Sequence, residues 1–425
     1  MNTQTTGNAS VKKAPAEAEA ELLLSRQEGV AGESRKADFI GIAVFLLFIF
    51  VIAVAFFLVP DKEMSESENR ALAQAPKFTL QSFLDNSFTD DLSDYYRDQF
   101  PARDFFRTVS AGADLLLLKQ ETNNVYFAKG GYLIKNNALD FSFDEKAAII
   151  KNNTNILKAY EKNFNTAGTE IRLAVAGRTV DVMSGLLPGY YPDNYSRYFE
   201  EYAADADGLS TVDLLTPLKD RAAAGEAVYY KTDHHWTTLG AYYAYAEILR
   251  AYGKEPLPLE AFSPEHAGTG FYGTTYSAAG AAWVASDTID FYRFGGDTEY
   301  KTEIYDGRDF RTIEGFYDRD YLAVRDQYSA FLGGNNPLVR ITKKGEEDRP
   351  VMILVKDSFG HALAPFLAVH YDLILVDLRY YQPGANEYMP SLSSLSETEH
   401  ADAILFLYNM DTFSSDTNLM KILSR

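Results

Sequence analysis

The chain has 425 residues, 46% of them hydrophobic and 24% charged, so it holds enough apolar material for a core and is not a wholly disordered chain. Its 60 acidic residues outnumber 40 basic ones and give a net charge of -20 at pH 7; a surface this acidic repels phosphate backbones, so we expect no nucleic-acid partner. The sequence contains no cysteine, which excludes disulfides, thiolate-bound zinc, iron–sulfur clusters and a cysteine nucleophile.

A long apolar segment near the N-terminus predicts a membrane anchor. Phe39 to Val59 contains 21 residues without a charge, and at about 1.5 Å per residue such a helix crosses the roughly 30 Å hydrocarbon layer. A cleaved signal peptide usually has a shorter apolar core, about 7–15 residues, followed by a small-x-small cleavage site, and no such site follows here. Because Arg35 and Lys36 precede the segment, the positive-inside rule places the N-terminus in the cytoplasm and the chain after Pro60 outside. We therefore expect a single-pass protein of the cell membrane with an extracytoplasmic body.

The segments on either side of this anchor (39–59) differ in composition. Residues 1–38 are rich in Ala, Glu, Gly and Ser and contain no aromatic residue, which is typical of a disordered tail, here cytoplasmic. In residues 60–125 apolar side chains recur at helical spacing, and Pro101 is well placed to start a further helix. We expect residues 60–125 to form a helical juxtamembrane stalk that packs on the body.

From residue 126 to residue 425 the pattern changes to short apolar runs separated by helix-length segments. Such runs between helices predict parallel strands that are covered on both faces. The expected strands are Ile171–Ala176, Ala227–Lys231, Val351–Val355, Leu373–Asp377 and Ala403–Tyr408. The fold class is therefore α/β, with a mostly parallel sheet and right-handed crossovers.

Two polar loops follow expected strands and hold most of the residues that can do chemistry. Lys231–Thr237 reads KTDHHWT and follows Ala227–Lys231, whereas Lys356–His361 reads KDSFGH and follows Val351–Val355. Function in open α/β sheets collects at the carboxyl ends of the strands. We therefore look for the site in these two loops.

The second loop offers a nucleophile and the first offers a base. A serine at a strand-to-helix turn, such as Ser358, has an exposed hydroxyl, and the partly positive amides of the first helical turn can stabilise an oxyanion. Serine alone is a weak nucleophile and needs a base, usually a histidine that a carboxylate orients. His235 and Asp233 can supply both from one segment. The sequence therefore predicts a catalytic triad in the chain order Asp233, His235, Ser358.

Each of these residues also has another interpretation. Ser358 can simply cap the following helix, since Ser and Asp are favoured N-cap residues. Asp233, His234 and His235 carry metal-ligand atoms, but neighbouring side chains of an extended segment point to opposite faces. We therefore do not expect both histidines to reach one ion, and we expect neither a metal nor a cofactor.

Further side chains near the two loops are candidates for substrate binding or for an oxyanion hole. Trp236 can stack on a sugar ring or pack in the core. His361 can line the pocket mouth or lie on the helix surface, and Asn409 can donate its amide to an oxyanion or stabilise a turn. His234 and Phe359 complete this set of candidates.

Several segments together resemble one bacterial family. They are the juxtamembrane SESENRALAQAPKFT, then DQFPARDFFR, the DHHW stretch, GTTYSAAG and VKDSFGHALAPFL. In this order, from about residue 60 to the end, they look like the DHHW family, which is related to the alginate O-acetylation proteins AlgJ and AlgX. The resemblance implies an SGNH-hydrolase-like α/β/α domain in which an Asp-x-His motif precedes the serine. Asp233 and His235 match that motif, with His234 as its variable middle residue. Ser358 matches the nucleophile.

The sequence departs from these relatives in two places. After Ile171–Ala176 it reads Gly177-Arg178-Thr179, where the resemblance implies a proline-containing exit. We also expect no counterpart, after the catalytic domain, of the carbohydrate-binding module found in AlgX. The sequence therefore makes no prediction for substrate recognition beyond the catalytic cleft.

The resemblance and the triad together predict an O-acetyltransferase or acetylesterase that acts on a cell-surface or exported polysaccharide. Ser358 would form an acyl-enzyme whose acetyl group passes to a sugar hydroxyl or to water. A single membrane span cannot itself carry acetyl groups across the bilayer, so by analogy a membrane-bound O-acyltransferase is the expected donor and partner. The alternative is a non-catalytic polysaccharide-binding or scaffold subunit that keeps the fold; loss of the contact between Ser358 and His235 would favour it.

Overall fold

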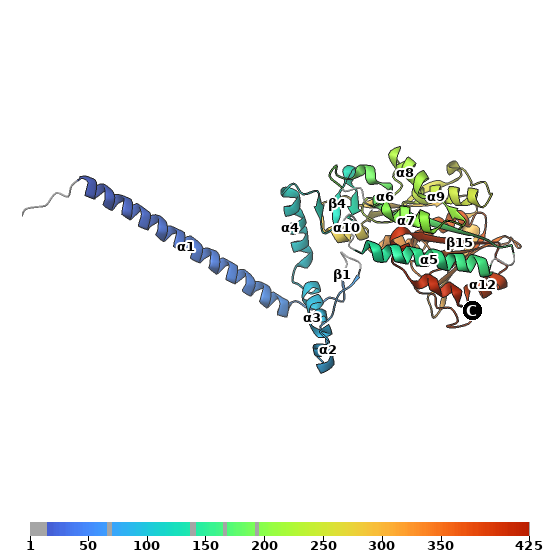
Figure 1. Ribbon diagram of the computed structural model, residues 1–425, viewed down its shortest axis with the longest axis horizontal. Coiled ribbons are helices and arrows are strands. Elements are labelled where there is room, and N and C mark those ends of the chain that lie inside the picture. Colours follow the sequence, from blue (N-terminus) through green and yellow to red (C-terminus); the bar gives the residue numbers. More distant parts are fainter. Residues whose placement is uncertain (1–14, 66–69, 137–141, 165–167, 192–194, 425) are drawn as a thin grey trace, which may run out of the picture. The chain divides into compact units, whose positions relative to one another are not determined.

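The computed structural model describes residues 15–65, 70–136, 142–164, 168–191 and 195–424. The chain divides into two compact units. The first consists of residues up to 64 together with 71–103, and the second consists of 65–70 and 104–425. The first unit holds the long N-terminal helix, and the second holds the large sheet (Figure 1).

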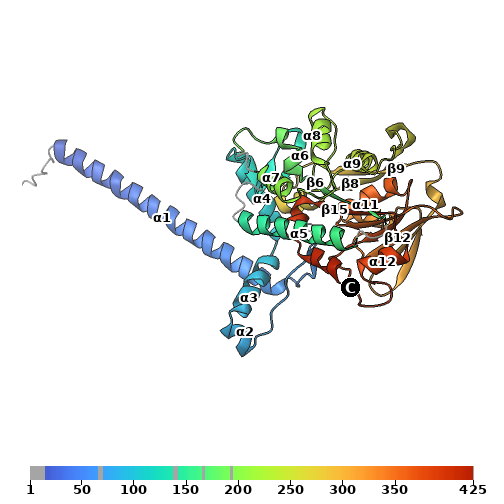
Figure 2. The same cartoon turned by 45° about the vertical axis from the view of Figure 1, so that its right-hand side comes forward.

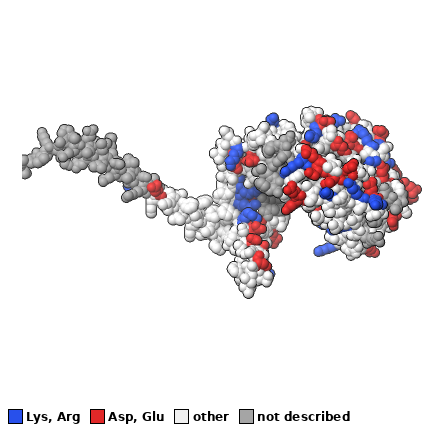
Figure 3. All heavy atoms as spheres, viewed as in Figure 1, with Lys and Arg blue, Asp and Glu red and all other residues white. Residues whose placement is uncertain are grey.

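The first unit begins with the helix α1 (Pro15–Leu58). Its apolar part, Asp38–Leu58, has a mean hydropathy of 3.2 and is not buried within the protein, so it is long and apolar enough to cross a membrane. Its visible surface is almost free of charged side chains (Figure 3). The start of α1 at Pro15 differs from the disordered tail expected for residues 1–38, because Ala, Glu and Leu just after Pro15 are strong helix formers. Residues 1–14 lie outside the described part of the chain.

Two short helices follow α1 in the first unit. Before α2 (Leu80–Leu84), the hydroxyl of Thr79 accepts a hydrogen bond from Ser82 N at 3.0 Å in a capping box. α3 (Ser87–Asp98) begins after Asn86, whose φ of 65° is left-handed, a conformation that asparagine tolerates. The cap and the turn therefore fix α2 and α3 as a short helical hairpin.

The helix α4 (Arg103–Leu116) leads into the second unit. Arg107 Nη2 donates to the carbonyl oxygens of Ser277 and Ala278, at 2.9 and 2.8 Å. Ala111 is fully buried on the same helix. These contacts fix α4 to the globular part of the second unit.

The second unit is built on a mixed sheet of eight strands in the order β11-β10-β12-β14-β13-β15-β6-β7. The strands are β6 (Glu170–Ala176), β7 (Thr211–Val212), β10 (Tyr300–Tyr305), β11 (Phe310–Glu314), β12 (Leu338–Lys343), β13 (Val351–Lys356), β14 (Asp372–Val376) and β15 (Ala403–Asn409). The five strands from β14 to β7 are parallel, whereas β12, β10 and β11 extend the sheet in antiparallel fashion. The α/β fold class is confirmed, although the antiparallel extension was not predicted.

Four of the five expected strands coincide with β6, β13, β14 and β15, but the fifth is wrong. Ala227–Lys231 contributes only an isolated bridge between Tyr229 and Trp236. Val228, Tyr229 and Tyr230 are buried. The apolar run therefore reflects packing of this segment into the core, without membership of the sheet.

Helices cover both faces of the sheet, and the alternation along each strand decides which core a side chain enters. In β13, Met352 and Leu354 enter the core formed with α9 and α11, and Ile353 and Val355 enter the core formed with α5 and α12. The covering helices are α5 (Phe143–Phe164), α6 (Thr179–Val182), α7 (Arg197–Asp205), α8 (Leu215–Ala223), α9 (Thr238–Ala251), α11 (Phe359–Leu367) and α12 (Leu392–Thr398). Figures 1 and 2 show this α/β/α sandwich, with α9 on one face and α12 on the other.

Smaller elements complete the chain. They are β1 (Met64–Ser65), β2 (Arg70–Ala71), β3 (Glu121–Thr122), β4 (Val125–Phe127), β5 (Leu133–Lys135), β8 (Ser263–Phe271), β9 (Asp287–Arg293), α10 (Thr274–Ala279) and α13 (Met410–Phe413). Short 3-10 helices cover Lys129–Gly131, Ser184–Leu186, Leu259–Ala261, Asp297–Glu299, Arg319–Ala323, Gln327–Ala330 and Asn418–Leu423. Of these, α10 and Gln327–Ala330 border the site described next.

Candidate active site

The DHHW segment lies in a loop that leads into α9. Residues 231–235 form successive bends, so the loop is not extended. Thr237 caps α9 by accepting a hydrogen bond from Gly240 N at 3.1 Å. A Cβ at Gly240 would lie 2.1 Å from Val228 O, so only glycine allows α9 to approach the preceding segment this closely. The loop is thereby held between a buried segment and a well-capped helix.

The buried carboxylate of Asp233 is surrounded by hydrogen-bond donors. Oδ1 accepts from His235 N at 3.0 Å and from His235 Nδ1 at 2.5 Å. Oδ2 accepts from the amide and the hydroxyl of Thr274, at 2.7 and 3.0 Å. A Cβ at Gly273 would lie 2.2 Å from Asp233, so this close approach requires glycine. Burial tends to raise the pKa of Asp233, but the adjacent imidazoles and these hydrogen bonds hold the pKa well below its ordinary value.

Ser358 follows β13 and stands at the start of α11. Its Oγ lies 2.7 Å from His235 Nε2. The expected neighbours are therefore brought together, and Asp233, His235 and Ser358 form one continuous hydrogen-bonded chain. In this chain the carboxylate holds Nδ1 of the imidazole and leaves Nε2 for the serine hydroxyl.

The imidazole of His235 is kept neutral by its surroundings. Burial and repulsion from His234 lower the pKa of His235, and the attraction of Asp233 only partly opposes them. A lowered pKa favours the neutral imidazole at neutral pH, which is the form that can accept a proton from a serine.

Tyr328 contacts both the histidine and the serine. Its ring stacks on that of His235, with centroids 3.9 Å apart and 11° between the planes. Its hydroxyl donates to the carbonyl oxygen of Ser358 at 3.3 Å. Sequence reasoning missed this residue because Tyr328 comes from a short 3-10 helix, Gln327–Ala330, in which no local pattern marks a site. It also missed Thr274, although GTTYSAAG was among the segments that carried the resemblance.

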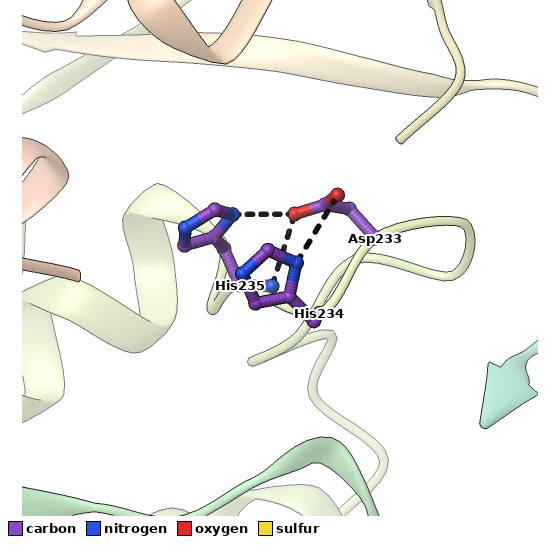
Figure 4. Close-up of side chains that lie close together, drawn as sticks. All are labelled: Asp233, His234 and His235. Atoms are coloured by element: carbon purple, nitrogen blue, oxygen red, sulfur yellow. Dashed lines mark hydrogen bonds and ion pairs between the residues drawn. The ribbon is translucent and has the colours of Figure 1, made fainter. Parts of the chain in front are cut away.

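His234 does not have its expected orientation. Its ring lies beside that of His235, with centroids 3.9 Å apart, and both Nδ1 atoms face the Asp233 carboxylate (Figure 4). The expectation of opposite faces is wrong because it assumed an extended segment, and the loop bends. His234 Nδ1 lies 2.6 Å from Thr274 Oγ1, and the side chain is 43% exposed. Desolvation tends to lower the pKa of His234, but Asp233 outweighs it and the pKa is raised.

Asp233, His234 and His235 also have the composition of a metal site, since their ligand atoms all lie within 4.8 Å of one another. A zinc ion would need a nitrogen lone pair from each ring. In the observed pattern His235 Nδ1 donates to Asp233, and its Nε2 faces Ser358. The hydrogen bonds therefore fit a triad better than a metal centre, and the expectation of no metal stays a prediction.

Trp236 and Phe359 form a buried wall beside the histidine. Trp236 is fully buried, and its Nε1 donates to Phe359 O at 3.1 Å. Core packing is therefore the correct interpretation of Trp236, because a buried indole has no face for a sugar ring. The amide of Phe359 donates to Asp357 Oδ1 at 2.9 Å. This amide is occupied and does not serve as an oxyanion donor in this arrangement.

Asn409 is a structural amide. Its Nδ2 donates to Gly177 O at 3.0 Å, and its Oδ1 accepts from Asp411 N at 3.0 Å. Its backbone amide donates to Asp357 Oδ2 at 2.7 Å. Asn409 thus joins the ends of β15, β6 and β13, and the suggestion that it donates to an oxyanion is wrong because its side chain is already used.

His361 belongs to a polar group that we call the Lys356 cluster: the buried Lys356, His361 and Asp377 and the partly exposed Arg379. His361 Nε2 lies 2.7 Å from Lys356 Nζ, which lies 3.6 Å from Asp377 Oδ2. Arg379 donates to Asp377 through Nε at 2.9 Å and Nη2 at 2.6 Å. Burial and the neighbouring Lys356 hold the pKa of His361 well below its ordinary value. His361 therefore lies neither at a pocket mouth nor on a helix surface.

The exit from β6 adjoins the DHHW loop. Thr179 Oγ1 donates to His234 O at 3.4 Å. Arg178 pairs with Asp181 through Nε and Nη2, at 2.8 and 2.7 Å, and its backbone amide donates to the same carboxylate at 2.8 Å. This buried pair turns the chain into α6 at the place where the resemblance implied a proline.

An α/β/α sandwich with a serine just beyond the carboxyl end of β13, and with a histidine and an aspartate brought to it by the loop before α9, is the arrangement of SGNH-hydrolase-like proteins. The chain matches the family model of the SGNH hydrolase-like domain, acetyltransferase AlgX, over residues 131–288. It also matches the family model of the DHHW protein over residues 217–377. The expected resemblance to DHHW proteins and to AlgX is confirmed.

Two relatives by sequence are probable alginate O-acetylases named AlgJ. The protein of Pseudomonas syringae pv. tomato is 26% identical over 187 residues, which are 42% of this chain and 45% of that protein. The protein of Azotobacter vinelandii is 28% identical over 163 residues, which are 35% of this chain and 38% of that protein. The matched region thus spans less than half the length of either relative.

Two solved structures have a similar fold. A DHHW family protein from Eubacterium siraeum has a TM-score of 0.53 at 19% identity and covers 72% of this chain and 98% of its own. PatB1 from Bacillus cereus has a TM-score of 0.57 at 16% identity and covers 69% of this chain and 97% of its own. At these identities the likeness establishes the fold alone.

Proposed function

We propose that this protein is a membrane-anchored, extracytoplasmic O-acetyltransferase, or an acetylesterase, that acts on a cell-surface or exported polysaccharide through Ser358. The observation that carries the proposal is the hydrogen-bonded chain from Asp233 through His235 to Ser358, with contacts of 2.5 and 2.7 Å. An ionised carboxylate, a neutral imidazole and a serine hydroxyl in this order are what acyl transfer through a serine requires.

In the proposed mechanism Ser358 Oγ attacks the acetyl carbonyl while its proton passes to His235 Nε2. Asp233 holds Nδ1–H and stabilises the imidazolium that forms. The tetrahedral intermediate collapses, His235 returns the proton to the leaving oxygen, and an acetyl-serine remains. A sugar hydroxyl, or water, then gives its proton to His235 and attacks the acetyl-serine, which regenerates Ser358.

The developing oxyanion needs donors other than those suggested by the sequence. Within the described residues, the backbone amide of Phe359 donates to Asp357. The side-chain amide of Asn409 donates to backbone carbonyl oxygens. The amides of Gly360 and His361 also have acceptors, the carbonyl oxygens of Asp357 and Ser358. The amide of Ser358 itself has no acceptor among the hydrogen bonds of this part of the chain, so we assign it as an oxyanion donor.

The acetyl group and the polysaccharide enter the proposal by analogy with the relatives. The matched AlgJ proteins are described as probable alginate O-acetylases, and the matched AlgX domain as an acetyltransferase. Since less than half of each AlgJ is matched, donor and acceptor remain inferences. We expect a polysaccharide acceptor and a membrane-bound O-acyltransferase as the acetyl donor.

The proposed organisation has a cytoplasmic tail (1–38), an anchor (39–59), a juxtamembrane region (60–125) and a catalytic domain (126–425). It is supported by α1, whose apolar part is long enough to cross a membrane. A protease added outside intact cells should degrade the chain after Pro60 and spare the tail. Protection of the DHHW segment would contradict this topology.

The experiment that tests the chemistry measures hydrolysis of p-nitrophenyl acetate by the full-length protein purified in detergent. Ser358→Ala removes the attacking oxygen, so turnover should fall to the background level, and the acetyl-serine seen by mass spectrometry in the native protein should disappear. Ser391→Ala is the matched control, because Ser391 caps α12 by accepting from Ser394 N at 3.2 Å. It should leave turnover unchanged. Equal activity of the native protein and Ser358→Ala, without acetyl-serine, would instead favour a non-catalytic scaffold.

A second measurement separates transferase from esterase. A transferase shields its acyl-enzyme from water, so adding a polysaccharide acceptor should accelerate turnover and transfer label from an acetyl donor to the polymer. An esterase passes acetyl groups to water and gains nothing from the acceptor. Measuring turnover and label transfer with and without the acceptor therefore shows whether the acetyl group passes to a sugar hydroxyl or to water. This result does not depend on a Ser358 variant.

A further inference from the structure

The chain just after α1 is bound to the end of α3. Gln99 Nε2 donates to Lys62 O, and Lys62 N donates to Gln99 Oε1, both at 2.9 Å. The hydroxyl of Tyr95 donates to the carboxylate of Asp61, with both oxygens at 3.1 Å. Since α1 ends at Leu58, the end of α3 is fixed only a few residues beyond the apolar segment.

Aromatic contacts fix α3 against α1 itself. The ring of Phe56, inside the apolar segment, lies 5.7 Å from that of Tyr95 and 5.1 Å from that of Tyr96, measured between centroids. Both views show α3 beside the end of α1 (Figures 1 and 2). Tyrosines are enriched where membrane-spanning helices meet the water interface. The position of Tyr95 and Tyr96 therefore marks α3 as an interfacial helix.

At its other end the helical hairpin exposes a group of large apolar side chains. We call this group the apolar tip: Phe78, Leu80, Phe83 and Leu84, which are 63%, 69%, 54% and 68% exposed. The ring of Phe78 packs on that of Phe88 of α3, with centroids 5.2 Å apart, so the tip is held on the hairpin. Single exposed apolar residues are ordinary, but four in seven successive positions form a patch that calls for a partner.

We propose that the apolar tip inserts into the lipid interface of the same membrane that α1 crosses, so that the α2–α3 hairpin is a second membrane contact of this protein. The proposal rests on the membrane insertion of α1 in the proposed function. Because α3 has 12 residues and is about 18 Å long, its first residues, against which the tip packs through Phe88, lie about that distance along the helix from the residues that contact Phe56. From Phe78 to Phe88 the only charged residue is Asp85, which suits the boundary between headgroups and acyl chains.

The absence of cysteine allows a direct test with single reporters. Full-length variants Leu84→Cys, Leu80→Cys, Asp91→Cys and Leu47→Cys are labelled with an environment-sensitive nitrobenzoxadiazole dye. Each is reconstituted alone into vesicles of phosphatidylethanolamine and phosphatidylglycerol. Asp91 is the matched control because it is exposed on α3 of the same hairpin. Leu47 reports whether α1 is inserted. Fluorescence is then quenched either by aqueous iodide or by lipids with a nitroxide on the acyl chain.

We expect the nitroxide lipid to quench the reporters at Leu84 and Leu80 several-fold more than the reporter at Asp91, and iodide to show the reverse order. If Leu47 is quenched by the nitroxide lipid while Leu84 and Leu80 behave like Asp91, the hairpin contact is overturned and the anchor stands. If Leu47 is also open to iodide, the proposed anchor fails and the hairpin contact fails with it. Shielding of Leu84 only after co-reconstitution with a multi-span acyltransferase would make the tip a protein contact and would overturn the lipid assignment.

Discussion

His235 and His361 are both buried and both lie near Tyr328, yet the charged groups that contact them have opposite signs. His235 has a carboxylate at Nδ1, with Asp233 Oδ1 2.5 Å away. His361 has an ammonium group at Nε2, with Lys356 Nζ 2.7 Å away. A proton on His235 is stabilised by its partner, whereas a proton on His361 is repelled. Burial lowers the pKa of both histidines, but only His235 has a neighbouring carboxylate that opposes this effect and stabilises the imidazolium.

The same comparison separates the two buried charge groups around Ser358. Asp233 and His235 end at the serine hydroxyl, so a proton can leave the pair through Nε2. The Lys356 cluster ends on Arg379 and Asp377, which bind each other. The proposed function therefore assigns catalysis to the first group, and we infer a role in stability for the second; substitutions at four residues test that division.

The largest effect is expected when the carboxylate beside His235 is removed. Asp233→Asn leaves the shape of the site but no longer holds the imidazole tautomer, so kcat for p-nitrophenyl acetate should fall by roughly 10⁴-fold. The matched control is Asp290→Asn, since Asp290 also lies 2.6 Å from a histidine, the exposed His266. That variant should keep its activity. Similar losses in both variants would contradict the special role of Asp233.

The second effect should appear in stability. Asp377→Asn leaves the buried Lys356, and the partly exposed Arg379, without their carboxylate, and should lower the free energy of unfolding by about 3–5 kcal/mol. Chemical denaturation measures this change, and the half-exposed pair Arg340–Glu399, 2.7 Å apart, supplies the control. Glu399→Gln should cost less than about 1 kcal/mol. Loss of kcat in Asp377→Asn at unchanged stability would contradict a purely stabilising role of the Lys356 cluster.

The Asp377 contribution should also depend on pH with a definite sign. Burial tends to raise the pKa of Asp377, but Lys356 and Arg379 outweigh it and the pKa is lowered. A carboxyl with a lowered pKa in the folded state stabilises the protein above its unfolded value of about 3.9, and this stabilisation is lost as the pH falls through the folded-state pKa. In Asp377→Asn the unfolding free energy should therefore fall less on acidification than in the native protein.

A smaller effect is expected in the pH profile of activity. Since the pKa of His235 is lowered, kcat/KM should persist below pH 6.5, the ordinary histidine value, and decline as His235 becomes protonated. His234→Gln removes a neighbouring positive charge and should move this decline to higher pH. It should also cost much less activity at neutral pH than Asp233→Asn. A decline that moves to lower pH, or does not move, would contradict repulsion between the two imidazoles.

The smallest effect concerns Tyr328. Tyr328→Phe keeps the ring that stacks on His235 and removes the hydrogen bond to Ser358 O, so the free energy of unfolding should fall by about 1 kcal/mol while kcat changes little. Tyr328→Leu also removes the stacked face and should lower kcat without a matching change in KM. Equal kcat values for the two variants would show that the ring does not position His235.

The sequence predicted the parallel half of the sheet because its strands are buried on both faces. Runs such as Ile353 to Val355 and Ile404 to Leu407 are apolar throughout, and this pattern is visible without any knowledge of neighbours. Ala227–Lys231 has the same local appearance, and Val228, Tyr229 and Tyr230 within it are buried, but the segment does not join the sheet. The two cases differ in what surrounds them, which a local pattern does not record.

The candidate site was predictable to the extent that its residues share short segments. Asp233 and His235 lie two apart, their position and that of Ser358 after expected strands suggested that the three meet, and the resemblance supported this link. The orientation of His234 depends on bends in the loop, and the roles of Trp236 and Asn409 depend on burial and on partners far along the chain. None of these is a property of the segment that holds the residue.

The position of β13 in the sheet determines how late in synthesis and folding this site can form. β13 lies between β14 and β15, both of which are made after it. During synthesis the DHHW loop is made long before β15 (Ala403–Asn409). Until β15 is made, β13, the strand that precedes Ser358, lacks one of its two neighbouring strands. Strand pairing of this kind forms late in folding because distant parts of the chain must first meet. If Ser358 acts as proposed, a ribosome-bound chain that lacks β15 would therefore carry His235 and Asp233 but no positioned Ser358, and we expect it to be inactive.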